Sequence, residues 1–312
     1  MQKTSHKPFV KSRLTQGILS TLAFFDIYKL PINTQRVFEL LYRVQANEKE
    51  VQLELDRLVT LGIIVHKEKK YALTDWDEKT FRDNQIEIEK RWTRIRHYYW
   101  LLSIVPFVQH VSVINSVAMG NADSESDIDF FVVTRPNRLY FVRSAIIILF
   151  KLLGVYKNKQ HVNMRFCFGF YITSDNLAIK SLLLPNEDPY LVFWMATIMP
   201  IYSLKYYEKL IKENKWIYSW FPNFKSHYRL EMYRKLKPKD GIKKLLELLF
   251  IIPAFLLEPL LRRIHIKHTF NLPENHWKTS STIANRAMLK LHALDPRKDL
   301  RAKFWETLSR YK

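Results

Sequence analysis

The sequence predicts an α+β protein in three parts, over residues 1–76, 77–185 and 186–312. The first part shows three stretches of helical periodicity followed by a short strand–turn–strand pattern. The second part has apolar, β-branched runs that alternate with helical stretches, which predicts a central mixed β-sheet with flanking helices. The third part is basic and mainly helical in period. Because 47% of the residues are hydrophobic, the chain can bury a sizeable core.

The N-terminal pattern is that of a winged-helix-like domain. We expect helices over residues 14–25 and 34–44, a third helix capped by Asn47 and ended by Gly62, and a wing whose two strands flank residues 66–70. The exposed side of the third helix is acidic, so the phosphates of DNA would repel it. We therefore favour a docking role for this domain over sequence-specific DNA binding. The acids in question are Glu48, Glu50, Glu54 and Asp56.

The remaining elements follow from periodicity and from punctuation by Gly and Pro. A long helix over residues 77–104 leads through Pro106 into the first strand of the sheet. A second helix and a second apolar strand follow. We expect further helices from residue 190 to 207 and through most of residues 208–312. We expect strands over residues 111–114, 128–133 and 164–173, and the second helix over residues 137–153.

Two carboxylates one residue apart are the most informative feature of the chain. Asp127 and Asp129 stand at the start of the apolar run that continues through Phe130 and Val133. Residues i and i+2 of a strand point to the same face, and a rise of ~3.3 Å per residue puts their Cα atoms about 7 Å apart. Such a pair can bind Mg²⁺ or Mn²⁺, because Mg²⁺ is usually held by one or two carboxylates together with substrate phosphates.

The segment before this pair predicts an anion site. The chain should turn at Asn115 and Ser116 and open a short helix, whose hydroxyl and free N–H groups would bind phosphate. Gly120 should end that helix, and a loop that includes Ser126 should return the chain to Asp127. A phosphate cradle would then face a metal site, which suits transfer of a nucleotidyl group from a nucleoside triphosphate.

The stretch NSVAMGNADSESDIDFFVV resembles the active-site signature of the DNA polymerase beta-like nucleotidyltransferase superfamily, in its minimal form. The resemblance implies that Ser116 contacts phosphate and that Asp127 and Asp129 are the metal ligands. Asn115 stands where the superfamily usually has Gly. Asn tolerates a left-handed backbone better than other residues with a side chain, so the turn can be kept.

A third carboxylate is not evident. The superfamily usually has an Asp or Glu on a later strand, but residues 164–173 contain no acid. Asp175, just beyond that strand, is the tentative third acid. Cys167 lies within the strand, and we expect a small buried hydrophobe rather than a nucleophile.

The wider arrangement also resembles a group of bacterial and archaeal proteins with a nucleotidyltransferase domain and an N-terminal winged helix. The resemblance includes a C-terminal cluster of His292, Asp295 and Arg297. His292 is a candidate base or phosphate contact, although helix capping by Asp295-Pro296 is the commoner outcome.

Charge is uneven along the chain. The net charge is +20, and residues 201–312 hold 24 Lys and Arg against 10 Asp and Glu. Three interpretations stay open for this basic region: binding of RNA or DNA, binding of an acidic membrane surface, or a solvated basic surface. The N-terminus lacks the apolar core of a signal peptide, and the apolar run over residues 248–257 is too short to span a bilayer. We therefore expect a cytoplasmic protein without a transmembrane segment.

Two functions follow from these observations. The first is a metal-dependent nucleotidyltransferase that transfers a nucleoside monophosphate from a triphosphate to a hydroxyl of RNA, of a protein or of a small molecule. The second is a catalytically inactive protein that uses the same fold to bind nucleotide or nucleic acid. Asn115 and the missing third acid motivate the second hypothesis.

Overall fold

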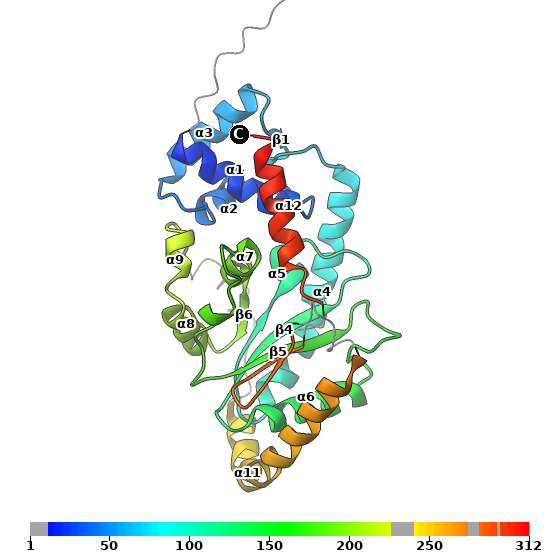
Figure 1. Cartoon of the computed structure of the whole chain (residues 1–312). Helices are drawn as coiled ribbons and strands as arrows, with labels where there is room; N and C mark the ends of the chain where they lie inside the picture. The colour runs from blue at the N-terminus through cyan, green and yellow to red at the C-terminus, as the bar shows by residue number, and fades with distance from the viewer. Residues whose placement is uncertain (1–11, 226–239, 274–280, 292–293, 312) are drawn as a thin grey trace, which may run out of the picture. The chain divides into compact units, whose positions relative to one another are not determined.

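The computed structural model describes residues 12–225, 240–273, 281–291 and 294–311 (Figure 1). The chain divides into two compact units. The first comprises Met1–Trp76, Trp216–Lys225 and Leu300–Lys312, and the second comprises Asp77–Lys215 and Ser226–Asp299. The region after residue 185 is thus shared between the two units. Helices and a mixed β-sheet together make the α+β class that the sequence predicts.

The first unit contains three helices followed by a two-stranded antiparallel sheet, in the predicted order. Asn47 and Glu50 form a reciprocal capping box at the start of the third helix, and Gly62 follows its end with a φ of 67°. Val51, Leu55 and Leu58 are fully buried on the inner face of that helix. The elements are α1 (Arg13–Asp26), α2 (Thr34–Glu39), α3 (Glu48–Thr60), β1 (Val65–Lys67) and β2 (Lys70–Ala72), joined by α9 (Ile217–Trp220) and the later residues of α12 (Arg297–Ser309).

The second unit is built on a sheet whose described strands have the order β6-β3-β4-β5-β8-β7. β4 and β5 are parallel, and every other neighbouring pair is antiparallel. A parallel pair needs a crossover connection, which helix α6 provides. The strands are β3 (Val108–Val113), β4 (Ile128–Thr134), β5 (Phe166–Thr173), β6 (Met199–Tyr202), β7 (Ile283–Ala284) and β8 (Met288–Lys290).

Aromatic side chains cover both faces of this sheet. Phe130 stacks on Phe168 at a centroid distance of 5.0 Å, and Phe150 of α6 packs against the same ring. On the opposite face, Phe131 meets Trp194 of α7 at 6.0 Å. α6 and α11 pack side by side (Figure 1). The helices are α4 (Glu78–Ile104), α5 (Asn115–Met119), α6 (Leu139–Leu152), α7 (Pro189–Thr197), α8 (Leu204–Glu213) and α11 (Asp240–Asn271), with a short 3₁₀ helix at Lys180–Leu182.

Three of the expected helical regions are wrong in part. The helix predicted over residues 34–44 ends at Glu39. The helix predicted over residues 190–207 is interrupted by β6, because Pro200 cannot continue a helix but fits an edge strand, where its missing N–H costs no ladder bond. The region predicted to be mainly helical contains β7 and β8, which are too short to show a strand period in the sequence. Among the described helices, none combines the length and the apolar character needed to cross a membrane.

Candidate active site

The predicted carboxylate pair lies at the start of β4. Asp127 directly precedes the strand and Asp129 is within it, while the fully buried Ile128 between them anchors the backbone. Cys167 of β5 pairs with Asp129 across the parallel ladder. One carboxylate oxygen of each aspartate and the Sγ of Cys167 all lie within 4.8 Å of one another. The structure therefore places Cys167 beside the pair, on the strand where the sequence resemblance predicts a third acid.

Asn115 positions Asp129. Its φ of 56° is left-handed, as the sequence predicts for a residue in place of Gly. Its Nδ2 donates to Asp129 Oδ2 at 2.8 Å, and its Oδ1 accepts from Trp194 Nε1 at 3.0 Å. The Tyr190 hydroxyl lies 3.5 Å from the same Oδ1. Asn115 thus links Asp129 to helix α7, a role that a Gly at this position could not have.

The electrostatics of the pair are unbalanced. Burial raises the pKa of Asp129 to about 6, and repulsion from Asp127 adds to this, while the hydrogen bond from Asn115 opposes it. The pKa of Cys167 is also raised, by burial and then by the two carboxylates, so its thiol stays protonated at neutral pH. A protonated thiol is neither a nucleophile nor a ligand for Mg²⁺.

Lys157 compensates one member of the pair. Its Nζ lies 2.6 Å from Asp127 Oδ2, and it follows α6 in the loop before β5. Sequence reasoning missed this contact, because 30 residues separate the two side chains and nothing local marks the lysine. A divalent cation fits this donor set, since two hard carboxylate oxygens converge here and Lys157 contacts only that of Asp127.

The residues predicted to form the phosphate cradle lie around α5. Ser116 is the second residue of this five-residue helix, and Gly120 ends it with a φ of 89°. Ser126 is engaged elsewhere, because its hydroxyl donates to Asp123 Oδ1 at 2.7 Å and closes the loop before Asp127. Of the predicted cradle, Asn115 therefore contacts the pair, Ser116 follows it in α5, and the side chain of Ser126 shapes the loop.

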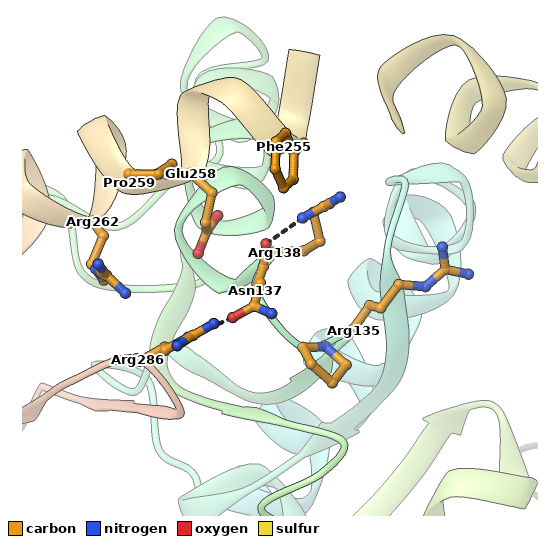
Figure 2. Close-up of a pocket in the computed structure, with 9 residues that line it drawn as sticks. Arg135, Asn137, Arg138, Phe255, Glu258, Pro259, Arg262 and Arg286 are labelled. Atoms are coloured by element: carbon orange, nitrogen blue, oxygen red, sulfur yellow. Dashed lines mark hydrogen bonds between the residues drawn. The ribbon is translucent and has the colours of Figure 1, made fainter. Parts of the chain in front are cut away.

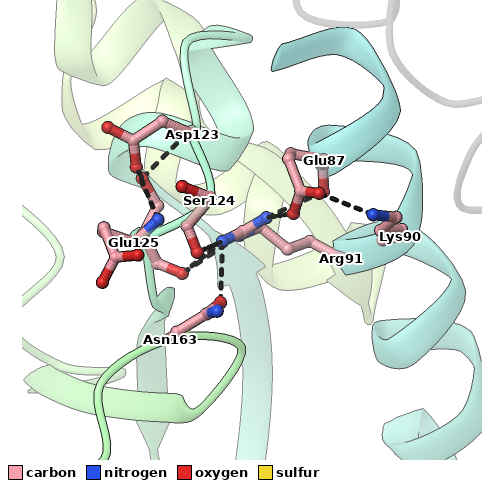
Figure 3. Close-up of polar contacts among 8 residues, drawn as sticks. Glu87, Lys90, Arg91, Asp123, Ser124, Glu125 and Asn163 are labelled. Atoms are coloured by element: carbon pink, nitrogen blue, oxygen red, sulfur yellow. Dashed lines mark hydrogen bonds and ion pairs between the residues drawn. The ribbon is translucent and has the colours of Figure 1, made fainter. Parts of the chain in front are cut away.

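A buried arginine holds that loop in place (Figure 3). Arg91 of α4 is fully buried, and its Nη2 donates to the carbonyl of Ser126 at 2.6 Å and to that of Ser124 at 3.3 Å. The same guanidinium pairs with Glu87 at 2.9 Å and contacts Asn163. Arg91 fixes the backbone immediately before Asp127, and no local pattern in the sequence indicates this role.

The structure does not bring Asp175 to the pair. β4 and β5 are parallel, so Cys167 lies at the same end as Asp129, whereas Asp175 follows Thr173 at the other end. Six residues from Cys167 to Thr173 correspond to about 20 Å of strand. The expectation that Asp175 reaches back is therefore corrected, because the direction of the strand carries it away. His292 lies outside the described residues.

A cavity of about 220 Å³ adjoins Asn115. Tyr190 and Trp194 line it, together with Lys290 of β8. Burial, and then the charge of Arg297, lower the pKa of Lys290 to about 8. Its Nζ donates to Ser281 Oγ at 2.5 Å. The cavity therefore combines aromatic rings with a cation next to the residue that positions Asp129.

Asp295 and Arg297, predicted as parts of a C-terminal cluster, do come together in the lining of this cavity. Arg297 bridges two carboxylates, with Nη1 2.8 Å from Asp188 and Nη2 2.6 Å from Asp295. Burial alone would raise the pKa of Asp295, but the hydrogen bonds and charge of Arg297 lower it to about 2. Asp188 also caps α7 by accepting from the N–H of Leu191 at 2.9 Å.

Comparisons with known proteins return no relative. No protein-family model matches the chain, and neither a curated protein nor a solved structure matches it. The site is therefore interpreted from its own geometry.

Proposed function

We propose that the second unit is a metal-dependent nucleotidyltransferase of the DNA polymerase beta-like superfamily, which transfers a nucleoside monophosphate from a triphosphate to an acceptor hydroxyl. The observation that carries the proposal is the pair Asp127 and Asp129, converged within 4.8 Å and clamped by Asn115 beside a cavity. The protein places one positive charge beside two adjacent carboxylates. Their mutual repulsion therefore destabilises the folded state unless a cation binds between them. Nucleotidyl transfer is the chemistry that this donor set and the sequence motif both suit.

Mg²⁺ or Mn²⁺ held by Asp127 and Asp129 would neutralise charge on the triphosphate and on the leaving pyrophosphate. The chain's own residues would orient the substrate. Ser116 and the N–H groups at the start of α5 would bind the phosphates, since the first N–H groups of a helix lack acceptors within it. Tyr190 and Trp194 would line the nucleoside side of the cavity, because aromatic rings stack on nucleobases.

The remaining parts of the chain would serve the acceptor. A surplus of 14 positive charges in residues 201–312 favours an RNA acceptor, with a protein or a small molecule as the other classes. The three helices and hairpin of the first unit suit a winged-helix-like domain, for which we propose docking rather than sequence-specific DNA binding. The acidic residues Glu48, Glu50 and Asp56 of its third helix are all exposed. We propose a cytoplasmic location for this activity.

A second candidate function is nucleotide binding without turnover. Lys157 lies 2.6 Å from Asp127, and a lysine in that position can replace part of the cation's charge. Cys167, with its raised pKa, cannot act as the third acid or as a base. Both observations favour a binding protein that uses the same site.

The test is to incubate the full chain with each α-³²P-labelled triphosphate, Mg²⁺ or Mn²⁺, and a mixture of cellular RNA and protein. The variant Asp127→Ala/Asp129→Ala should lose label incorporation by about a thousandfold or more, since metal and electrostatic stabilisation supplies several kcal/mol to such reactions. Asp175→Ala is the matched control, because it removes an acid outside the cluster, and it should keep full incorporation.

The outcomes separate the two functions. Equal labelling by wild type and double variant would refute the proposed mechanism. Nucleotide binding without labelling of any acceptor would support the binding protein instead.

A further inference from the structure

Helix α11 carries its large apolar side chains on the outside. Leu248 is 70% exposed, and Ile252, Phe255 and Leu256 are almost as exposed. Of the 24 large hydrophobic residues that are exposed in the described parts of the chain, 13 belong to this helix, so the exposure is concentrated rather than scattered. They are Ile242, Leu245, Leu248, Leu249, Phe250, Ile251, Ile252, Phe255, Leu256, Leu257, Leu260, Ile264 and Phe270.

The inner side of α11 is polar. Lys243 is buried and donates to the carbonyl of Val108 and to the hydroxyl of Tyr202, the latter at 2.8 Å. Four residues later, Glu247 accepts from the N–H of Phe107 at 2.9 Å. These contacts attach the first half of the helix to the start of β3 through charge and hydrogen bonds.

The second half of α11 is attached in the same way. Glu258 is buried, and its two carboxylate oxygens accept from the N–H groups of Tyr140 and Phe141 at 3.0 and 2.8 Å. Two helical turns further on, His265 Nε2 lies 2.9 Å from Ser144 Oγ. Positions 243, 247, 254, 258 and 265 follow one helical face, and all of them except Ala254 are polar. Leu261 and Ile266 add partly buried apolar contacts with the core. A helix surrounded by water is instead expected to have a mainly apolar inner face and a polar outer one.

A cationic pocket borders the apolar side of this helix (Figure 2). Its volume is about 440 Å³, and Arg135, Arg138, Arg262 and Arg286 line it together with Phe255 and Pro259. The one carboxylate in its wall, that of Glu258, is already engaged by backbone N–H groups. The buried Nε of Arg138 has no hydrogen-bond partner within the described residues. Arg135 pairs with Glu247 at 3.6 Å, so the pocket has one unused buried donor and still more cations than carboxylates.

We propose that α11 binds the surface of a bilayer that contains anionic phospholipid, with its apolar side chains among the acyl chains and the arginine pocket on a headgroup phosphate. Contiguous exposed apolar patches mark interaction sites, and a helix that is apolar outside and flanked by cations suits a membrane interface. Within residues 241–271 the exposed charged side chains are Lys244, Arg263 and Lys267, all cationic.

Charge distinguishes a bilayer from a second copy of the chain as the occupant. A second copy would bring another molecule of net charge +20 against the same cations, so like charges would oppose the contact. An anionic lipid surface has the complementary charge and attracts each nearby Lys or Arg. The inference does not depend on the proposed catalytic function, because lipid binding is read without any transfer reaction.

The experiment is flotation of the full chain with vesicles of phosphatidylcholine alone and of phosphatidylcholine with phosphatidylglycerol. We expect binding to the anionic vesicles, weakened by added salt. Leu248→Ser/Ile252→Ser/Leu256→Ser should weaken it on the order of a hundredfold, because burial of these side chains supplies the apolar contribution. Arg262→Gln/Arg286→Gln should weaken it about tenfold.

The control is Leu53→Ser/Leu61→Ser, which removes two apolar side chains of the first unit that are also more than half exposed and should leave flotation unchanged. All these substitutions are at exposed or half-buried positions, so an unchanged thermal unfolding curve serves as the check on folding. Failure of the wild type to float with anionic vesicles would overturn the proposal. So would equal flotation of the triple variant, or a dimer in solution that the triple variant dissociates.

Discussion

Two pairs of aspartates in the second unit differ in what the protein places between them. Arg297 bridges Asp188 and Asp295 at 2.8 and 2.6 Å, and the pKa of Asp295 falls to about 2. Lys157 reaches only Asp127 of the other pair, and the pKa of Asp129 rises to about 6. An ionised aspartate therefore stabilises the folded state in the Arg297 cluster and destabilises it at Asp129.

The difference indicates which cluster is structural. Asp188 caps α7 and has its charge compensated, so Arg297 completes a network that is satisfied within the chain. Asp129 keeps an unfavourable carboxylate next to Asp127, which is the condition expected of a functional site.

The largest effect should come from Arg297→Met. It leaves Asp188, which is fully buried, without its counter-charge, and breaking such a pair typically costs about 3–5 kcal/mol of unfolding free energy. Urea unfolding at pH 7 measures this loss. The neighbouring exposed Lys298→Met is the control and should change stability by less than about 0.5 kcal/mol. A loss below about 1 kcal/mol for Arg297→Met would show that this cluster is not structural.

His110 is a third kind of buried titratable group: it has hydrogen-bond partners but no carboxylate that would stabilise its charged form. Its Nε2 lies 2.6 Å from Ser112 Oγ and its Nδ1 3.1 Å from the carbonyl of Ser203. Burial lowers the pKa of His110 from 6.5 to about 4, and the backbone hydrogen bonds only partly oppose this. The folded state therefore disfavours the proton that the unfolded state takes up below pH 6.5.

Stability should consequently fall as the pH decreases from 6.5 to 4, by about 3 kcal/mol, since each pKa unit is worth about 1.4 kcal/mol. Above pH 6.5 this contribution should be constant. Urea unfolding at a series of pH values measures the slope, and His110→Gln should remove that part of it. An identical slope in the variant would mean that other groups cause the acid sensitivity.

Asp129→Asn should stabilise the chain in the absence of divalent cations, by about 1–2 kcal/mol, because it relieves burial of a charge beside Asp127. Asp295→Asn is the matched substitution in the other cluster, and it should destabilise by a similar amount because Arg297 loses a charged partner. Thermal unfolding in EDTA compares the two signs. Added Mg²⁺ should then raise the melting temperature of the wild type but not of Asp129→Asn. Equal signs for the two variants would remove the distinction between the clusters.

The sequence could predict the parts of this site that depend on short spacing. Asp127 and Asp129 share one strand, and the left-handed turn at Asn115 is a local backbone property. Lys157 and Arg91 could not be predicted, because their partners lie 30 or more residues away and no periodicity connects them. Asp175 was misplaced since its nearness to the strand in sequence does not reveal the direction of β5.

The fold shows the same division. Long amphipathic helices and capped helix starts could be predicted, as with the Asn47 cap of α3. The short strands β6, β7 and β8 could not, because two to four residues carry no measurable period and their stability comes from pairing: β6 with β3, β8 with β5, and β7 with β8. The inverted polarity of α11 also required the structure, because the sequence does not show which side of the helix is packed.

The smallest predicted effect separates the two roles of Asn115. Asn115→Gly keeps the left-handed φ of 56° without steric cost but loses the bonds to Asp129 and Trp194. Asn115→Ala loses the same bonds and adds backbone strain, so it should be less stable than the Gly variant by about 1 kcal/mol. Thermal unfolding measures this difference, and both variants should show a weaker stabilisation by Mg²⁺ because Asp129 is no longer positioned.

Asn186 provides the matched control, since it is exposed, has a φ of 59° and lies outside the site. Its Gly and Ala variants should show the same order of stability with an unchanged response to Mg²⁺. If the Asn115 variants also respond to Mg²⁺ as the wild type does, Asn115 acts only as a turn residue. The position of Asp129 would then be set by β4 alone. The two aspartate clusters would differ only in their cation, because Lys157 contacts one carboxylate and Arg297 contacts two.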